Sequence, residues 1–268
     1  MTEEIILGIV QGITEWLPVS SSGMLLLIEN NFFANSSRSL VDNLQLITFL
    51  HLGTFFSALI YFRRDVWNVI KTLFSYKKQS QTDQALFHFL LLTTIVTGIV
   101  GYGIKELIEF AEGAVVFTGP IINAILGLLL IGTAIASLKK RESDNPREIR
   151  SLNGKDSVFL GILQGLSAFP GISRSGTTVF GILFRRFEKE SALRVSFIMG
   201  LPVTLGANIV WGTFSLVFTA ANLVAFFFSF IFGLLTIHVL LRFAERVNVG
   251  YFLLLFGILL VLASFLPL

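Results

Sequence analysis

Long apolar runs separated by short clusters of charged residues dominate this chain. Runs of about 20 apolar residues match the length of helix that crosses the hydrocarbon core of a bilayer. Six such runs predict membrane-spanning helices near residues 44–62, 86–104, 119–138, 193–213, 217–241 and 250–267. The composition agrees, because 54% of the residues are hydrophobic, 14% are charged and the mean hydropathy is +0.79. The predicted fold class is therefore an all-α integral membrane protein.

Two further apolar regions are interrupted near their middle by proline, glycine or serine. Their pieces cover residues 3–17, 22–33, 157–169 and 175–187, with breaks at Pro18, Pro170 and Gly171. Pieces of about a dozen residues are too short to cross a bilayer. Because irregular backbone inside a membrane must be surrounded by protein or line a cavity, these regions predict two re-entrant helical hairpins.

Both broken regions carry the same motif. Residues 7–23 read LGIVQGITEWLPVSSSG, residues 160–176 read LGILQGLSAFPGISRSG, and the two align without a gap. Broken helices in corresponding positions of two halves point to a binding site near the membrane midplane. The alternative is a pair of glycine and proline kinks in ordinary helices, and the length of the match argues against it.

Charge gives the predicted orientation. Lysines and arginines cluster after the first, third and fifth spans and before the fourth, whereas Glu106, Glu109 and Glu112 follow the second. Basic loops usually face the cytoplasm. Three spans separate the motif copies, so the first hairpin is expected to enter from outside, the second from the cytoplasm, and the repeat is inverted. We predict one polytopic domain over 1–268, with halves at 1–138 and 157–268 and a basic cytoplasmic loop at 139–156.

The absence of cysteine excludes disulfides and thiol chemistry, and a net charge of +3 does not call for a nucleic-acid partner. The chemistry must come from other residues.

Arg174 lies in the second loop, PGISRSGTT. An arginine at membrane depth costs about 2.5–3.5 kcal/mol on insertion scales unless it faces a partner or a cavity. With hydroxyls and a predicted helix start beside it, Arg174 indicates an anion site suited to phosphate. Pairing with Glu15 for structure alone is the alternative, and the two are compatible.

The first loop offers Ser20, Ser21 and Ser22 before a second predicted helix start. These residues form a second anion cradle by the same argument, and one hydroxyl could act as a nucleophile beside a base. The alternative is helix N-capping, which serine favours in any case.

Glu15 lies four residues after Gln11, so both side chains share one helix face. A carboxylate in an apolar helix is a functional-site hypothesis: a base, a magnesium ligand or the partner of Arg174. The second copy has Gln164 and an alanine at these positions, so the acid is unique to the first half.

His51 is predicted to lie about 10 Å deep in the first span, at 1.5 Å per residue. It is first interpreted as a hydrogen-bonded packing histidine.

These residues resemble the undecaprenyl-diphosphate phosphatase family of bacitracin-resistance type, and the resemblance covers essentially the whole chain. LGIVQGITEWLPVSSSG is similar to its first signature, and PGISRSGTT matches its second. The resemblance implies hydrolysis of the C55 polyprenyl diphosphate to the monophosphate with a divalent cation such as Mg²⁺, which recycles the lipid carrier for cell-envelope glycan synthesis. It implies catalytic roles for Glu15, Ser21 and Arg174, with Glu15 also a metal ligand. We expect the headgroup to be bound by Gln11, Ser20, Ser22, Ser173, Ser175 and Thr178.

Met24 departs from the family pattern, which has histidine directly after the glycine of the first loop. A thioether is only a weak acceptor and cannot shuttle a proton. Glu15 as the base, His51 as a substitute base, or a metal-bound water would each replace the missing imidazole. We expect Met24→His to raise phosphatase activity. The alternative function is a polyprenyl-phosphate transporter or flippase that binds the headgroup without hydrolysis.

The predicted surroundings follow from the same residues. The partners expected are the polyprenyl diphosphate lipid and the bilayer, with no nucleic acid. The chain is expected in the cell membrane as a multi-pass protein whose active site faces outside, because the Ser-rich hairpin and Glu15 enter from that side. Self-association into a homo-oligomer stays an alternative to a monomer.

Overall fold

The computed structural model describes residues 2–32, 40–110, 118–139, 146–169, 171–214 and 219–265. These residues form an almost entirely helical protein, and within them one isolated bridge pairs Arg147 with Phe187. The helices are α1 (Thr2–Thr14), α2 (Ser21–Phe32), α3 (Leu40–Tyr61), α4 (Arg63–Ser75), η1 (Tyr76–Lys78), α5 (Gln81–Phe110), α6 (Thr118–Lys139), η2 (Ile149–Ser151), α7 (Gly154–Leu166), α8 (Arg174–Phe184), α9 (Lys189–Val210), α10 (Ala220–Arg246) and α11 (Val249–Ala263).

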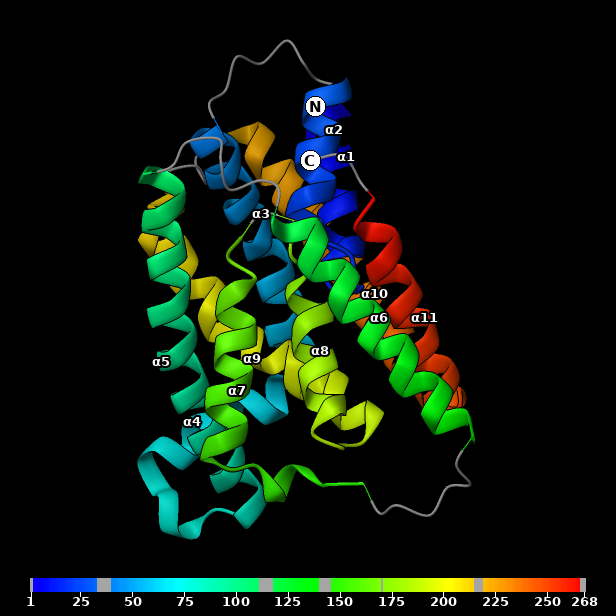
Figure 1. Ribbon diagram of the computed structural model, residues 1–268. Coiled ribbons are helices and arrows are strands. Elements are labelled where there is room, and N and C mark those ends of the chain that lie inside the picture. Colours follow the sequence, from blue (N-terminus) through cyan, green and yellow to red (C-terminus); the bar gives the residue numbers. More distant parts are fainter. Residues whose placement is uncertain are drawn as a thin grey trace.

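The long helices run through the molecule from end to end (Figure 1). Within the described residues, α3, α5, α9 and α10 are long and apolar enough to cross a membrane. The other two predicted spans correspond to α6 and α11, which pack side by side and whose apolar stretches are shorter, at Asn123–Gly132 and Gly250–Ala263. The prediction of an all-α, multi-pass membrane protein is confirmed.

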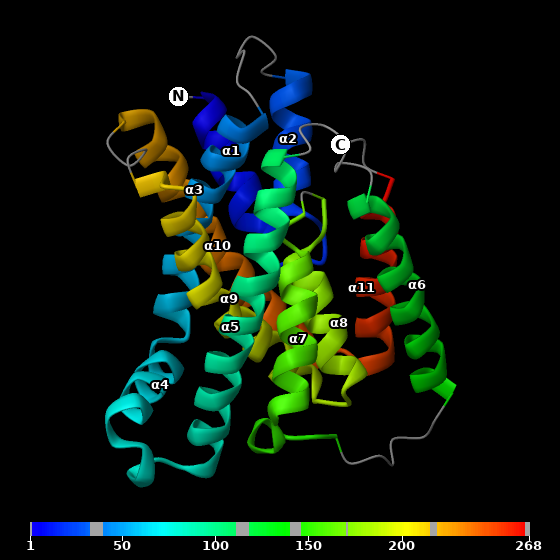
Figure 2. The same ribbon diagram turned by 60° about the vertical axis from the view of Figure 1, so that its left-hand side comes forward.

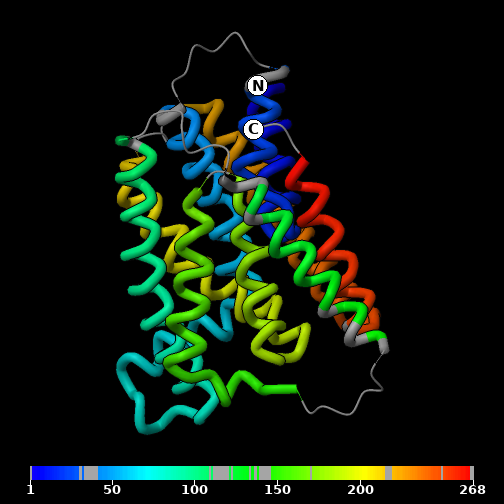
Figure 3. Tube along the Cα trace, viewed as in Figure 1, coloured from blue at the N-terminus to red at the C-terminus, as the bar shows by residue number. Residues whose placement is uncertain are grey.

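Both broken regions are helical hairpins, and they enter the helix bundle from opposite ends. Figure 2 shows α1 and α2 together at one end, while α7 and α8 turn back within the other half. The trace in Figure 3 shows the same opposition from the view of Figure 1. We call the end that carries α4 and η2 the basic side, since exposed arginines and lysines such as Arg64 and Lys77 lie there. The first hairpin therefore enters from the side opposite the basic one.

The glycines of the motif have the same packing role in both copies. A Cβ at Gly8 or Gly12 of α1 would overlap the backbone of α10, at Ala225 or Gly233. A Cβ at Gly161 or Gly165 of α7 would overlap a valine side chain of α5. The glycines at positions i and i+4 thus let each half-length helix approach a long helix of the other half closely, as small residues do in membrane helix packing.

Two elements differ from the sequence prediction. The segment after the first span, expected as a basic loop, forms the amphipathic helix α4, whose exposed side includes Trp67 and Phe74. Its apolar residues recur with helical periodicity, but the run is too short to span. The second span also extends beyond 86–104, because α5 continues through polar residues at both ends.

Ion pairs hold the second hairpin at the basic side. Asp156, in the first turn of α7, is fully buried and accepts hydrogen bonds from Arg147 at 2.7 Å and from Arg185 at 2.6 Å. Asn153 caps the same helix, accepting from the backbone N–H groups of Lys155 and Asp156. A capped helix start with a carboxylate in its first turn is stabilised against fraying, which fixes the base of the hairpin. Residues 140–145 of the predicted 139–156 loop lie outside the described residues.

Candidate functional site

The tips of the two hairpins meet in the interior of the molecule. Arg174 Nη2, from the first residue of α8, donates to Glu15 Oε1 at 2.6 Å. The two residues are 159 positions apart in the chain, and both side chains are largely buried, with 14% and 4% exposed. The predicted pairing of Glu15 with Arg174 is therefore confirmed. A short, charge-assisted hydrogen bond of this kind is stronger than a neutral one, so it fixes the two loops against each other.

The second carboxylate oxygen of Glu15 accepts three further contacts. Gln11 Nε2 donates to Oε2 at 3.0 Å, and Ser21 Oγ donates to it at 2.8 Å. His51 Nε2, which comes from the spanning helix α3, lies 3.1 Å from the same oxygen. A single buried carboxylate thus contacts a hydroxyl, an amide, an imidazole and a guanidinium. The contact with Ser21 is the hydrogen bond expected between a nucleophile and its base.

His51 lies between two oxygen acceptors. Nδ1 lies 2.6 Å from the carbonyl oxygen of Ile47, which can only accept. Nε2 faces the carboxylate of Glu15, which also accepts when ionised. With Glu15 ionised, both ring nitrogens face oxygen acceptors, an arrangement that the two N–H groups of an imidazolium satisfy. His51 makes the hydrogen bond expected of a packing histidine, with Ile47, and its Nε2 also contacts Glu15 at the cavity, so its role as a substitute base stays a prediction.

Arg174 is held by more than its carboxylate partner. Nη1 donates to the carbonyl oxygen of Ser196 at 3.2 Å, and the guanidinium carbon lies 5.6 Å from the centre of the Trp16 ring. The guanidinium also passes directly over Gly200 of α9, where a Cβ would overlap it. Gly200 therefore leaves the space that Arg174 needs, a function that the sequence did not reveal.

Several of the predicted headgroup ligands hold the loops instead of facing open space. Ser20 and Ser173 cap the starts of α2 and α8, with Oγ accepting from the N–H of Gly23 or Gly176 at 3.1 Å. Ser175 Oγ donates to the carbonyl of Leu17 at 2.5 Å, which ties the two loops together.

Thr178 and Gln11 are likewise engaged within the protein. Thr178 Oγ1 donates to the carbonyl of Arg174 at 2.8 Å, and Gln11 is fully buried against Glu15. Direct binding of substrate by these residues stays a prediction. The N-capping alternative for the first-loop serines is confirmed at Ser20, and Ser173 caps α8 in the same way.

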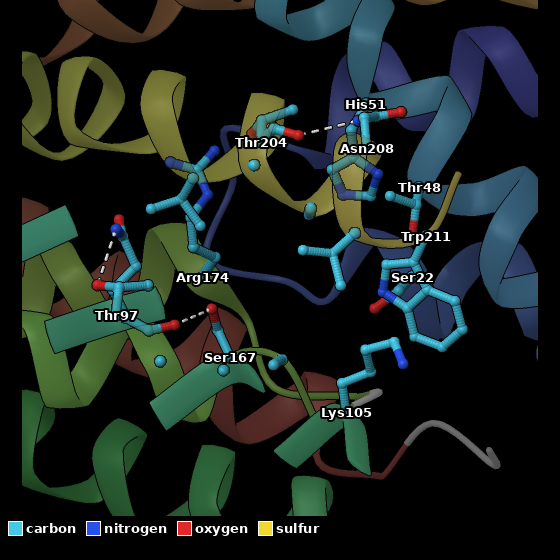
Figure 4. Close-up of a pocket in the computed structure, with 18 of the residues that line it drawn as sticks. Ser22, Thr48, His51, Thr97, Lys105, Ser167, Arg174, Thr204, Asn208 and Trp211 are labelled. Atoms are coloured by element: carbon cyan, nitrogen blue, oxygen red, sulfur yellow. Dashed lines mark hydrogen bonds between the residues drawn. The ribbon is translucent and has the colours of Figure 1, made fainter. Parts of the chain in front are cut away.

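A cavity of about 320 Å³ lies beside this cluster. Glu15, Ser21, Ser22, His51 and Arg174 all line it, together with residues, most of them from α5, α7 and α9, for which the sequence analysis predicted no role in the site. The close-up in Figure 4 shows side chains from these elements directed toward one space. The additional polar or aromatic lining residues are Thr48, Thr94, Thr97, Tyr102, Lys105, Gln164, Ser167, Thr204, Asn208 and Trp211.

One of these additional residues could have been found from the repeat. Gln164 occupies the position of Gln11 in the second motif copy, and its Nε2 donates to Thr97 Oγ1 and to the carbonyl of Met199, both at 3.3 Å. Lys105 gave a weaker signal, as a basic residue next to the acidic cluster after the second span.

The lining does not fit a preformed magnesium site. Glu15 is the one acid among the described lining residues, and its oxygens already accept from four groups, two of them cationic. Mg²⁺ requires free oxygen ligands in octahedral geometry, and positive neighbours oppose its binding. Within the described ranges, no three or more histidine, aspartate or glutamate side chains gather as a metal-binding group.

Met24 lies in α2, where its backbone N–H donates to the carbonyl of Ser20 at 2.9 Å. It is partly buried, but it is not among the described residues that line the cavity. The imidazole that reaches Glu15 in this chain comes from α3 instead, through His51.

Comparison with known proteins agrees with the site. The chain is 40% identical to an undecaprenyl-diphosphatase of Methanococcoides burtonii over 99% of both chains. It is 34% identical to undecaprenyl-diphosphatase 2 of Halalkalibacterium halodurans over 93% of this chain and 90% of the relative, and 33% identical to an undecaprenyl-diphosphatase of Alkaliphilus metalliredigens over 92% of both. The family model described as bacitracin resistance protein BacA matches residues 4–263, which include both hairpins and every residue of the cluster around Glu15. The chain is thus a member of the BacA family.

Proposed function

We propose that this protein is an integral membrane phosphatase that hydrolyses a polyprenyl diphosphate of undecaprenyl type to the monophosphate. The observation that carries the proposal is the single carboxylate, Glu15, that contacts Ser21, His51 and Arg174 on the wall of one cavity. The names of the relatives support the same substrate. Among the charged lining residues, Arg174, Lys105 and protonated His51 outweigh Glu15, so the cavity favours an anionic headgroup.

The contacts of these residues support a proposed step for each of them. Glu15 accepts the proton of the Ser21 hydroxyl, or of a water bound in its place, as that oxygen attacks the terminal phosphorus. The bond between this phosphorus and the bridging oxygen breaks, and protonated His51 supplies a proton to the departing lipid monophosphate. Arg174 neutralises the charge that spreads over the terminal phosphate oxygens in the transition state. If Ser21 attacks, neutral His51 then takes a proton from the water that attacks the phosphoserine, the bond between phosphorus and the Ser21 oxygen breaks, Glu15 returns its proton to that oxygen, and inorganic phosphate is released.

His51 would therefore act first as an acid, while Glu15 acts as the base. The alternative of His51 as the primary base is less favourable, because an imidazolium, which satisfies both oxygen acceptors around the ring, has no lone pair to accept a proton. No step is assigned to a metal ion, since Glu15 offers no free oxygen for one. The requirement for Mg²⁺ stays a prediction, and adding EDTA to the reaction and then restoring Mg²⁺ checks it.

The active site is proposed to face outside the cell membrane. Glu15 and Ser21 belong to the hairpin that enters opposite the basic side, and basic loops usually lie in the cytoplasm. Monomeric and homo-oligomeric forms of the single 1–268 domain are both compatible with this proposal.

Phosphate release from farnesyl diphosphate by purified protein in detergent tests the function. We expect steady release by the wild type and release on the order of 10⁴-fold slower by Arg174→Ala at equal folded concentration. Tight binding of the diphosphate to the folded wild type with no release over hours would contradict hydrolysis and favour the carrier alternative. A matched control is Arg64→Ala, which removes an exposed arginine on the basic side, outside the cavity.

A further inference from the structure

The amphipathic helix α4 leaves an apolar face uncovered. The exposed apolar side chains of this face recur every three or four residues. They are Trp67, Ile70, Leu73 and Phe74, with 56%, 41%, 62% and 81% exposed. Val66 and Val69 of the same helix pack against the core instead, and they fix how the helix is rotated. An exposed apolar face of this extent marks a site of contact with a partner or a membrane.

The neighbouring spans place this face at the edge of the membrane. The span in α3 covers Asp42–Tyr61, and its 20 residues are the length that crosses the hydrocarbon core. The chain turns at Phe62, α4 begins at Arg63, and the next span starts at Gln81 in α5. Figure 1 shows α4 at the basic end of the molecule, where it contacts α5. A helix of 13 residues is too short to cross a bilayer, but it can lie along the surface with its apolar side chains inserted.

The same segment is positively charged. Residues 66–82 contain three lysines and no acidic residue. The lysines are Lys71, Lys77 and Lys78, and all three are exposed. No ion pair within the described ranges involves any of them. The acids on either side are engaged elsewhere, since Asp65 accepts a hydrogen bond from Arg194, and Asp83 accepts one from Ser80 at 2.6 Å.

Lys71 connects the charge with the apolar face. Its Nζ lies 5.5 Å from the centre of the Trp67 ring. Tryptophan is enriched at the headgroup level of a bilayer, where a lysine can keep its ammonium in water and its stem on apolar surface. A second copy of this chain is a less favourable occupant of the face, because it would bring a second set of lysines close to the first.

We propose that α4 and η1 form a binding surface for anionic phospholipids, in the leaflet on the basic side of the protein. The apolar side chains insert among the acyl chains, while the three lysines contact the lipid phosphate groups without a covalent step. Each lysine held near an anionic membrane surface raises the affinity about fivefold. This inference goes beyond the proposed hydrolysis and does not depend on it.

The position of the apolar face is tested with a fluorophore on single cysteines, since the chain has none of its own. Ile70→Cys labels the apolar face, and Ser75→Cys labels an exposed position about 140° away around the helix. The proteins are reconstituted in vesicles of equal parts phosphatidylglycerol and phosphatidylcholine, with iodide on both sides. Lipids with a nitroxide on the acyl chain should quench the Ile70 label, and iodide should quench the Ser75 label. Equal quenching of both labels by iodide would overturn the inference.

The charge is tested by comparing two lipids on the Ile70 label. Nitroxide-labelled phosphatidylglycerol should quench it more strongly than nitroxide-labelled phosphatidylcholine at equal mole fraction. In Lys77→Gln/Lys78→Gln this preference should fall about fivefold or more. The matched control is Arg150→Gln/Lys155→Gln, which removes two exposed cations on the basic side outside α4 and η1 and should keep the preference.

Three further outcomes would contradict the proposed lipid surface. One is quenching of the label to the same extent by the two lipids in the otherwise unchanged protein. Another is an equal fall in the control, which would indicate a general effect of net charge. The third is self-quenching of the Ile70 label that disappears on dilution with unlabelled protein, which would identify a second copy of the chain as the occupant.

Discussion

The two hairpins share a scaffold but not a chemistry. In each, a glycine pair seats the first helix against a long helix of the other half, and a serine caps the second helix. The first hairpin then places an acid and a hydroxyl at the cavity, through Glu15 and Ser21, whereas the second places Arg174 there. Inverted duplication therefore provides two matching loops that meet, and a few substitutions make one loop acidic and the other basic.

The two halves also differ in how the long helices pack beside the hairpins. Gly53 of α3 and Gly206 of α9 each follow the last glycine of their motif copy by 30 residues. A Cβ at Gly53 would overlap Ser229 of α10, whereas a Cβ at Gly206 would meet nothing within 4 Å. The helices α3 and α10 are thus in direct contact at Gly53. The corresponding region of α9 has open space at Gly206 and lines the cavity beside α5. The active-site cavity occupies the place where the second half does not repeat the packing of the first.

The largest expected effect comes from removing the basic member of the pair. Arg174→Ala should lower kcat/KM on the order of 10⁴-fold, because the transition state loses its fixed cation. Phosphate release from farnesyl diphosphate measures this loss. The variant leaves Glu15 buried with one cation fewer, so Arg174→Lys, which keeps the charge, is measured beside it. Arg174→Lys with full activity would show that the guanidinium geometry is not required.

Removing the acidic member is expected to cost less than removing the arginine. Glu15→Gln should reduce kcat on the order of 10³-fold, since an amide cannot accept the proton of Ser21. Single-turnover phosphate release at saturating substrate measures the chemical step. Full activity in a folded Glu15→Gln protein would exclude Glu15 as the base.

His51 sharpens the comparison with Met24. His51→Gln should lower kcat on the order of 10²-fold and flatten the alkaline limb of the pH–rate profile, because the acid that deprotonates as pH rises is gone. Met24→His in the wild type should raise activity only slightly, since an imidazole is already in place. In the His51→Gln background it should restore part of the rate. An unchanged alkaline limb in His51→Gln would contradict its role as the acid.

Gly200→Ala probes the position of Arg174 without removing its charge. The new Cβ would displace the guanidinium, and a misplacement of about 1 Å predicts a ten- to hundredfold loss of kcat. Gly132→Ala, in open space on α6 and not among the described residues that line the cavity, is the control and should retain activity. Equal kinetics for the two variants would mean that Arg174 tolerates displacement.

The smallest effect on activity is expected for Gly53→Ala, which changes the contact between α3 and α10. Gly53→Ala should destabilise the protein by about 2 kcal/mol, because an added methyl overlaps Ser229, whereas Gly206→Ala should be close to neutral. Thermal unfolding in one detergent compares the two. If Gly53→Ala unfolds at a higher temperature than Gly206→Ala, the packing at Gly53 is not tighter than at Gly206.

Much of this arrangement could be predicted from the sequence, because its causes are local. Short apolar pieces around proline predict hairpins, and an arginine and a glutamate at membrane depth predict each other. The hydroxyls were less predictable, since Ser20, Ser21 and Ser173 share one residue type but divide between helix caps and the contact with Glu15. Only the direction of each side chain separates these functions.

The missed residues depend on contacts between distant segments. Lys105 belongs to a spanning helix, and whether it faces lipid, packing or a cavity follows from how α5 is rotated. For the same reason His51, predicted as a substitute base, could not be placed against Glu15 from the sequence. Gly200 matters only because the Arg174 side chain crosses α9 at that position. The helix α4 was missed for a different reason. Its charges indicated a cytoplasmic loop, and the prediction gave these charges more weight than the helical periodicity of its apolar residues.

The central claim is that the two hairpin loops close around one headgroup inside the membrane. Because the chain lacks cysteine, Ser22→Cys and Ser167→Cys can be introduced as a unique pair, one from each hairpin, both on the cavity wall. A short bifunctional thiol reagent should cross-link this pair in membranes, and a non-hydrolysable farnesyl diphosphonate should slow the reaction. Single cysteines that react normally while the pair never cross-links would contradict a shared cavity.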